Sequence, residues 1–377
     1  MAKVVSVTNS KGGTGKTSDA ICIGAELAKR GKKVVLVDMD PQANLTEDLG
    51  VKITSVDPRI ASNKLVSVDC TDPTKMIYQK TIPELPNLYL IPGHTQLVFQ
   101  DRILLEGLLE EQKMRAKKDD ESAKKIIRAM RTESGKCINA HDGGLFEKLA
   151  DRMEKQYVGL MYSDKEYEQL TQYDEALVLF KNMKKYENVF DFFDYIIFDL
   201  NTYMSMCAEN ALAVSDSLIC VTDPSIDGLR GVMTFVGLWN RISKKLNLAT
   251  EDMEQCIVLN KYKGNTRFGK KIMSILRGEF GDEDTLEKEL FEEFHDYYVD
   301  VPIPESVKFP ESASEHVPLI VAKKRREWLL EHFSELDQET KKRYKSRYLL
   351  KEDIKKYEEL ENTISQLVDK LMERGIL

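Results

Sequence analysis

The chain has 377 residues, of which 42% are hydrophobic, and its formal net charge at pH 7 is −8. This length accommodates one large α/β domain with additions, or two domains. The negative charge argues against a protein that coats DNA with its whole surface, but it is compatible with a local basic face. No apolar run is long enough to span a bilayer. The first residues enter a strand-like pattern without the features of a signal peptide, so we expect a cytoplasmic protein.

Short apolar and β-branched runs alternate with helical patterns along most of the chain. Such runs occupy residues 3–8, 32–38, 88–92, 193–199, 216–222 and 256–260. After the first run, apolar residues recur at helical spacing until Gly31, which provides a C-terminal stop. The alternation predicts an α/β fold with a doubly wound, mostly parallel sheet that helices cover on both faces. The six cysteines are widely spaced without a C-x-x-C pair, which indicates reduced thiols rather than a metal site.

Two segments do not follow this pattern. Residues 96–186 are charged and helix-prone, and a connection of that length predicts an inserted helical subdomain rather than a bare loop. The tail is also helical in pattern, and its apolar stripe consists of Leu360, Ile364, Leu367, Val368 and Leu371. We therefore divide the chain into the first part of a core (1–95), a helical insertion (96–186), the second part of the core (187–322) and a helical C-terminal tail (323–377).

The stretch SVTNSKGGTGKTSDA, residues 6–20, has the ending of a phosphate loop but departs from the usual pattern at its start. Ser10 stands where that pattern has its first glycine, and a second lysine, Lys11, follows it. In such a loop, successive backbone N–H groups and the dipole of the following helix bind an anion. A chance glycine turn is the alternative, but a strand-like run before the loop and a helical pattern after it are the context of a nucleotide site.

The side chains of this loop fit a nucleotide with Mg²⁺. The glycines allow the backbone to approach phosphate oxygens closely, Lys16 suits the β and γ phosphates, and the Thr17 hydroxyl suits the metal ion. Lys11 can lie over the phosphates from outside or point into a facing protomer as a point charge, and the alternative is a solvated surface lysine. The predicted nucleotide-binding residues are Lys11, Gly12, Gly13, Thr14, Gly15, Lys16, Thr17 and Ser18.

Polar side chains follow the predicted strands at their carboxyl ends, where parallel sheets bind ligands. Asp38 ends the second run and Asp40 follows it, while Asp199 and Asn260 end two later runs. An acid beside a phosphate loop suits a metal ion or an attacking water. The alternatives are that Asp38 or Asp40 caps the following turn and that Asn260 is a plain turn residue.

Five segments, in order, resemble the motifs of one family, the ParA/MinD ATPases with a deviant Walker A phosphate loop. They are KGGTGKT, VLVDMDPQANLT (35–46), YIIFD, NKYKGNTR (260–267) and IPESVKFPESASEHVPLI (303–320). The likeness spans the start and most of the end of residues 1–320 and fails across the insertion. Within the family, the chain is most similar to the ParA ATPases of plasmid and chromosome partition.

The resemblance implies a P-loop NTPase fold and a weak, Mg²⁺-dependent ATPase that forms a homodimer with ATP. In this family-type mechanism, Lys11 crosses a nucleotide-sandwich dimer to the partner's phosphates. Lys16 contacts the phosphates of its own subunit, and Asp40 positions or activates the attacking water. These three residues are the expected catalytic residues.

The resemblance also implies which residues surround the metal ion and the base. Thr17, Asp38 and Asp199 are the expected Mg²⁺ site, with the two acids acting through water. Asn260 is expected to contact adenine, and Pro304 is expected to lie near the base.

One departure from the family bears on hydrolysis. Family members usually have prolines, roughly Asp-x-Pro-Pro, in the segment that senses the γ-phosphate, whereas Asn201 and Thr202 stand there in this chain. Losing prolines removes a backbone restraint and adds hydrogen-bonding groups. We therefore expect ATP binding, with hydrolysis or its coupling to partners altered, and a nucleotide-binding regulatory protein with little hydrolysis is an alternative.

The likeness to ParA further implies association with the nucleoid through non-specific duplex DNA, and a centromere-binding ParB-type activator. Arg241 and Arg267 resemble DNA-contacting positions, and Lys270 extends the basic face, although solvated surface charges are the alternative. A MinD-like membrane protein is the second alternative. Acids on the polar side of the C-terminal stripe oppose anionic lipid, so we expect that stripe to pack on the body or on a second protomer.

Overall fold

A computed structural model of the chain describes residues 2–70, 72–79, 82–100, 178–245, 254–279, 294–344 and 347–377. Most of the predicted insertion, residues 101–177, lies outside the described residues. Its described end contains α7 (Val178–Lys185), which packs on the core. Leu179 is buried there, and the amide of the buried Asn182 donates to the backbone oxygens of Leu65 and Ser67. The boundaries of the insertion stay a prediction.

In the described part of the chain, eight strands form one sheet in the order β3-β4-β2-β5-β1-β6-β7-β8. Neighbouring strands are parallel except at one edge, where β3 (Tyr78–Gln79) is antiparallel to β4 (Leu88–Ile91). The other strands are β1 (Lys3–Thr8), β2 (Val34–Asp38), β5 (Tyr195–Asp199), β6 (Ser217–Thr222), β7 (Glu254–Leu259) and β8 (Tyr298–Val299). All six predicted strands are present, and the chain winds outward from β1 in both directions, so the doubly wound, mostly parallel fold is confirmed.

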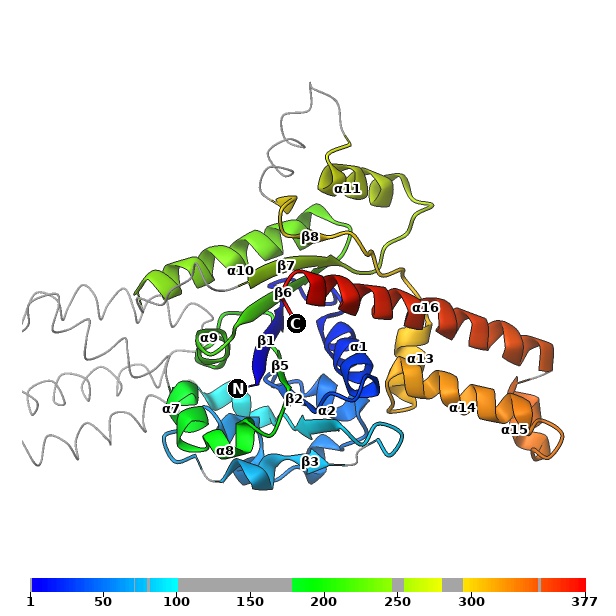
Figure 1. The fold of residues 1–377 in the computed structure, drawn as a ribbon, viewed down its shortest axis with the longest axis horizontal. Helices are drawn as coiled ribbons and strands as arrows, with labels where there is room; N and C mark the ends of the chain where they lie inside the picture. Colours follow the sequence, from blue (N-terminus) through cyan, green and yellow to red (C-terminus); the bar gives the residue numbers. More distant parts are fainter. Residues whose placement is uncertain are drawn as a thin grey trace, which may run out of the picture.

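Helices cover both faces of the sheet (Figure 1). One face packs against α1 (Lys16–Lys29), α2 (Asn44–Asp48), α14 (Leu319–Glu331) and α16 (Arg347–Glu373). The other face packs against α7, α8 (Glu187–Phe190), α9 (Met206–Ala213), α10 (Ile226–Lys245) and α11 (Arg267–Arg277). Successive side chains of a strand point to opposite faces. Leu36 therefore joins the first hydrophobic cluster and Val35 the second, which is why the central strands are nearly continuous apolar runs.

The C-terminal helix α16 packs on the body of the protein beside α1 and α14 (Figure 1). Ion pairs join its polar side to α1, since Arg30 lies 2.6 Å from Asp369 and Lys29 lies 2.8 Å from Glu361. The predicted apolar stripe is at most 3% exposed, at Leu360, Ile364, Leu367, Val368 and Leu371. The stripe is therefore covered by the rest of the same chain. Packing on the body was one of the two arrangements that the sequence predicted. None of the described helices is long and apolar enough to cross a membrane.

Candidate nucleotide-binding site

A cavity of about 1120 Å³ opens at the carboxyl ends of the strands, beside the glycine-rich loop between β1 and α1. This volume slightly exceeds the range of about 300–1,000 Å³ that is typical of small-molecule sites. The predicted residues that line it are Gly12, Gly13, Gly15, Lys16, Thr17, Ser18, Asp40, Asn260 and Pro304. The structure therefore brings together residues from the two ends of the family likeness. Thr14 is buried beneath the loop, and Lys11, Asp38 and Asp199 border the site without lining the cavity.

The loop needs glycine at position 15. Gly15 has φ = 101° and precedes the first turn of α1, where its carbonyl accepts a 2.9 Å hydrogen bond from the N–H of Asp19. A Cβ atom at this position would overlap the side-chain amide of Asn260. The close approach of the Asn260 side chain to the loop therefore requires glycine at position 15, as does the left-handed conformation.

Lys16 and Thr17 lie where a polyphosphate and its metal ion would bind. Burial lowers the pKa of Lys16, and the charges of Asp199 and Asp40 oppose that shift. A bound polyphosphate would supply more of the same compensation. The hydroxyl of Thr17 donates a 2.7 Å hydrogen bond to Oδ2 of Asp199.

Asp199 has an oxygen to offer to a cation. Among the described residues, its buried Oδ1 has no hydrogen-bond partner. Burial first, and then the charge of Asp38, raises the pKa of Asp199 well above its usual range. A hard cation takes oxygen ligands and keeps several waters, so Thr17 and Asp199 fit Mg²⁺. Among the described residues, no three or more His, Cys, Asp or Glu side chains are grouped so that they could hold a metal ion.

Asp38 and Asp40 have different surroundings although only one residue separates them. Asp38 is fully buried, and its carboxylate accepts hydrogen bonds from the N–H and hydroxyl of Thr46, at 2.9 and 2.6 Å, and from the N–H of Asp40. Burial raises the pKa of Asp38 to about 7, although these hydrogen bonds act to lower it. Asp40 is half-buried, lines the cavity and accepts a 2.8 Å bond from the N–H of Gln42. Asp38 thus holds the chain around α2, while Asp40 faces the cavity.

The ammonium group of Lys11 is directed away from the cavity that its own loop lines. It lies 2.6 Å from Asp223 and 2.8 Å from the hydroxyl of Ser225, both after the end of β6. The Lys11 side chain keeps 31% of its surface exposed. Its carbonyl oxygen accepts a 3.4 Å hydrogen bond from Lys16. The two lysines of the loop therefore have separate places, one inside the cavity and one beside it.

Two contacts near Asn260, on the side of the cavity that Pro304 lines, were missed by the sequence analysis. Asn260 donates a 2.8 Å hydrogen bond to the buried Asp19 in the first turn of α1. Lys261 follows with φ = 54°, and its ammonium group donates a 2.6 Å bond to the carbonyl of Gly13. An acid in the apolar run after the phosphate loop was the available signal for Asp19. Pro304 forms a bridge with Tyr262, which brings the segment after β8 alongside.

The segment that replaces the family's prolines is held by its own side chains. Asn201 is 3% exposed, and its amide donates a 3.1 Å hydrogen bond to the hydroxyl of Ser205. Within the described chain its Oδ1 is buried without a partner. Both Asn201 and Thr202 line the cavity. A polar side chain therefore takes the place of the proline restraint next to the phosphate loop.

The predicted DNA-contacting residues lie on two helices. Thr266 caps the N-terminus of α11 by accepting from the N–H of Gly269, and Arg267 and Lys270 in its first turns are exposed. Arg241 belongs to α10, but its side chain lies outside the described residues. The side chains of α11 that face the sheet are buried and apolar, so its basic residues project outward.

The fold and this site define a P-loop nucleotide-binding protein. A family model described as an AAA domain matches residues 2–126 and 154–251, which is more than half of the chain. The chain therefore belongs to this family and is a P-loop ATPase of the ParA/MinD type. This confirms the resemblance read from the five motifs.

Relatives agree with this assignment. The sporulation initiation inhibitor protein Soj of Bacillus subtilis is 23% identical over 321 residues, covering 85% of this chain and 91% of the relative. The chromosome partitioning protein ParA of Myxococcus xanthus is 35% identical over 104 residues, covering 27% and 36%. Among solved structures, a variant of McdA from Cyanothece in complex with ATP has a TM-score of 0.55 at 16% identity, covering 98% of this chain and 96% of that one. The last likeness is one of fold.

Proposed function

We propose that this protein is a ParA-like partition ATPase that dimerises with ATP, binds duplex DNA without sequence preference and hydrolyses ATP weakly until a ParB-type partner stimulates it. The position of Lys11 carries the proposal. Its loop lines the cavity while its ammonium group lies outside, partly exposed and paired with Asp223. A cation in that place can serve phosphates that belong to a facing subunit.

The residues of the cavity have separate roles in this mechanism. The loop amides and Lys16 bind the phosphates, and Asp40 orients the attacking water from the cavity wall. Thr17 and, through water, Asp199 would hold Mg²⁺. When bound, Mg²⁺ neutralises charge that develops on the phosphate oxygens. Asp38 supports this site through its hydrogen bonds with Thr46. Asn260 and Pro304 lie on the side of the cavity that would receive the base.

Non-specific DNA binding is proposed for the exposed first turns of α11. Arg267 and Lys270 project from this helix, away from its buried face. Cations of this kind bind phosphates irrespective of sequence, and their contribution falls with salt concentration. The net charge of −8 requires such binding to be local. The buried stripe of α16 supports this proposal over a membrane-bound protein, because it is not available to lipid.

A regulatory protein that binds nucleotide with little turnover is the second candidate. Asn201 favours it, because an amide whose buried oxygen has no partner among the described residues stands where the segment that senses the γ-phosphate usually has a proline. Turnover measured with and without duplex DNA separates the two candidates. If Asp40→Ala abolishes hydrolysis, the protein is the proposed enzyme. If Asp40→Ala leaves the measured rate unchanged, the regulatory protein is supported instead.

Size-exclusion chromatography with light scattering tests the dimer. The 43.2 kDa chain should be monomeric with ADP and about twice that mass with a non-hydrolysable ATP analogue, because only the triphosphate offers a γ-phosphate to the partner's Lys11. Duplex DNA should co-elute with the dimer. Lys11→Ala should bind the analogue and stay monomeric. A Lys11→Ala protein that dimerises and hydrolyses normally would refute the proposal.

A further inference from the structure

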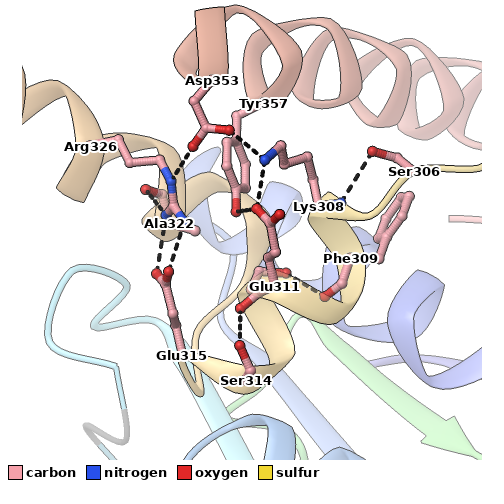
Figure 2. Close-up of polar contacts among 11 residues, drawn as sticks. Ser306, Lys308, Phe309, Glu311, Ser314, Glu315, Ala322, Arg326, Asp353 and Tyr357 are labelled. Carbon is pink, nitrogen blue, oxygen red and sulfur yellow. Dashed lines mark hydrogen bonds and ion pairs between the residues drawn. The ribbon is translucent and has the colours of Figure 1, made fainter. Parts of the chain in front are cut away.

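Charged side chains gather where the short helix α13 (Lys308–Ser314) meets α14 and α16 (Figure 2), and its two cations are buried. We call this group the helix junction, and it consists of Lys308, Glu311, Glu315, Arg326, Asp353 and Tyr357. The side chain of Arg326 is 5% exposed and that of Lys308 is 7% exposed. Charged side chains are rarely buried to this degree unless they are paired, so these positions require partners.

Asp353 on α16 supplies a partner to both other helices, as Figure 2 shows. One carboxylate oxygen pairs with the ammonium group of Lys308 on α13, and the other accepts a 2.8 Å bond from Nε of Arg326 on α14. Arg326 also donates to both oxygens of Glu315, at 2.7 and 3.1 Å. Burial lowers the pKa of Lys308, but the hydrogen bonds that its ammonium donates to Asp353 and Glu311 outweigh burial and raise that pKa, so the ammonium stays charged.

An aromatic ring closes the helix junction from the side of α16. Tyr357 is fully buried, and its ring centre lies 4.5 Å from Cζ of Arg326 and 5.4 Å from Nζ of Lys308. Its hydroxyl donates a 3.4 Å hydrogen bond to Glu311. Charge, ring stacking and hydrogen bonds therefore favour one placement of α13 relative to α16.

The opposite side of α13 is a wall of the nucleotide cavity. Val307 and Phe309, the two neighbours of Lys308, line that cavity, as do Pro310 and Ala313. These side chains are apolar, whereas the phosphate loop across the cavity presents N–H groups and lysine. A nucleotide bound with its phosphates on the loop would place its base on the apolar side.

We propose that Asp353 is a positioning residue that fixes α13 as the base-side wall, so that the C-terminal helix α16 is part of the nucleotide site. This inference rests on the nucleotide binding in the proposed function and is independent of dimerisation and DNA. Asp353 itself touches no nucleotide, and it acts through Lys308 and the backbone of residues 307–309. Without it, the wall moves and contact with the base is lost, while the phosphate loop stays intact.

Two probes separate the base from the phosphates. ATP and inorganic triphosphate, each with Mg²⁺, are titrated calorimetrically into the full-length protein. In the wild type, ATP should bind more tightly than triphosphate. Asp353→Asn should weaken ATP on the order of three- to tenfold and leave triphosphate unchanged. Asp353→Glu, which keeps the charge, should restore part of the difference.

Matched controls exclude a general loss of structure. Glu373→Gln makes the same acid-to-amide change on α16, at a residue whose pair with Lys370 is exposed, and should alter neither titration. Lys308→Met removes the same ion pair from the α13 side, while Asp353 keeps its bond with Arg326. Lys308→Met should therefore weaken ATP and spare triphosphate as Asp353→Asn does, and it tests the inference even if Asp353→Asn folds poorly. Equal weakening of both probes, or no weakening in either variant, overturns the inference. If the wild-type protein binds ATP but never dimerises, the partition proposal fails while the inference about Asp353 is unaffected.

Discussion

The side-chain amide of Asn260, after β7, donates a 2.8 Å hydrogen bond to Asp19, a fully buried carboxyl group in the first turn of α1. The bond joins the helix after the phosphate loop to the loop after β7, across one side of the cavity. Among the described residues, Oδ2 of Asp19 has no hydrogen-bond partner. Burial raises the pKa of Asp19 well above its usual value of 3.8, against the hydrogen bond from Asn260.

Asp19→Asn is expected to stabilise the protein at neutral and higher pH. Because the folded-state pKa is raised, the folded chain retains a proton that the unfolded chain releases, so the free energy of unfolding falls as pH rises from about 4 to the folded pKa. Asparagine does not titrate, and it keeps an oxygen for Asn260. The melting temperature of the variant should exceed that of the wild type by a few degrees at pH 8, and the gap should narrow towards pH 4. A gap that is constant with pH would contradict this account.

Gly15→Ala should damage both the fold and the site, whereas Gly12→Ala should be tolerated by the fold. At position 15, φ is 101° and a Cβ would overlap the Asn260 amide. A left-handed non-glycine residue alone costs about 1–3 kcal/mol. At position 12, a Cβ would lie 3.9 Å from Cγ2 of Thr202, which is ordinary contact. Thermal melting and ATP titration of the two variants check this, and equal losses in both would show that any added methyl group blocks the loop.

The fold and the phosphate side of the cavity could be predicted from the sequence because they depend on local patterns. Buried parallel strands are nearly continuous apolar runs, and β1, β2 and β5 therefore stand out as runs that end in polar residues. The Gly15-Lys16-Thr17 ending indicates phosphate binding by the order and spacing of its residues. Each of these features is complete within about ten consecutive residues.

Contacts that join distant segments could not be predicted in the same way. Asp38 and Asp40 look alike as strand-end acids, and their different roles depend on Thr46, which closes over only one of them. The pairing of Lys11 with Asp223 joins residues 212 apart. Periodicity gives the buried side of α16 but not the fact that Asp353 would lie against α13. Side-chain direction and tertiary register decide these cases.

Asp38→Ala and Asp40→Ala should fail in different ways. Removing the Asp38 carboxylate leaves the buried N–H and hydroxyl of Thr46 without their acceptor, which costs about 1–3 kcal/mol, so the melting temperature should fall. Asp40→Ala should keep the wild-type melting temperature and ATP affinity but lose about 10²- to 10⁴-fold in turnover, because only the placement of water is lost. Melting curves and single-turnover rates separate them. A rate loss in Asp38→Ala without destabilisation would assign that acid to the chemistry instead.

Asp223→Asn should make dimerisation easier. Lys11 must leave its 2.6 Å ion pair with Asp223 before it can reach a facing subunit, and the amide holds it less strongly. The variant should therefore dimerise at a lower concentration of ATP analogue than the wild type, as light scattering would report. Asp227→Asn is the control, because Asp227 lies nearby on α10, is 79% exposed and pairs only loosely with Arg230 at 3.6 Å. An unchanged midpoint in Asp223→Asn would show that the pair does not restrain Lys11.

Arg267→Ala and Lys270→Ala should weaken DNA binding equally for unrelated duplex sequences. A cation that contacts phosphate contributes by releasing counterions, so each loss should reduce the slope of log K against log salt concentration by about 1. Arg277→Ala at the opposite end of α11 is the matched control, since Arg277 already pairs with Asp300 at 2.8 Å. Fluorescence anisotropy at several salt concentrations, with the ATP analogue present, measures all three. If Arg277→Ala changes the slope as much as Arg267→Ala, the effect comes from net charge, and the exposed first turns of α11 are not the DNA-binding face.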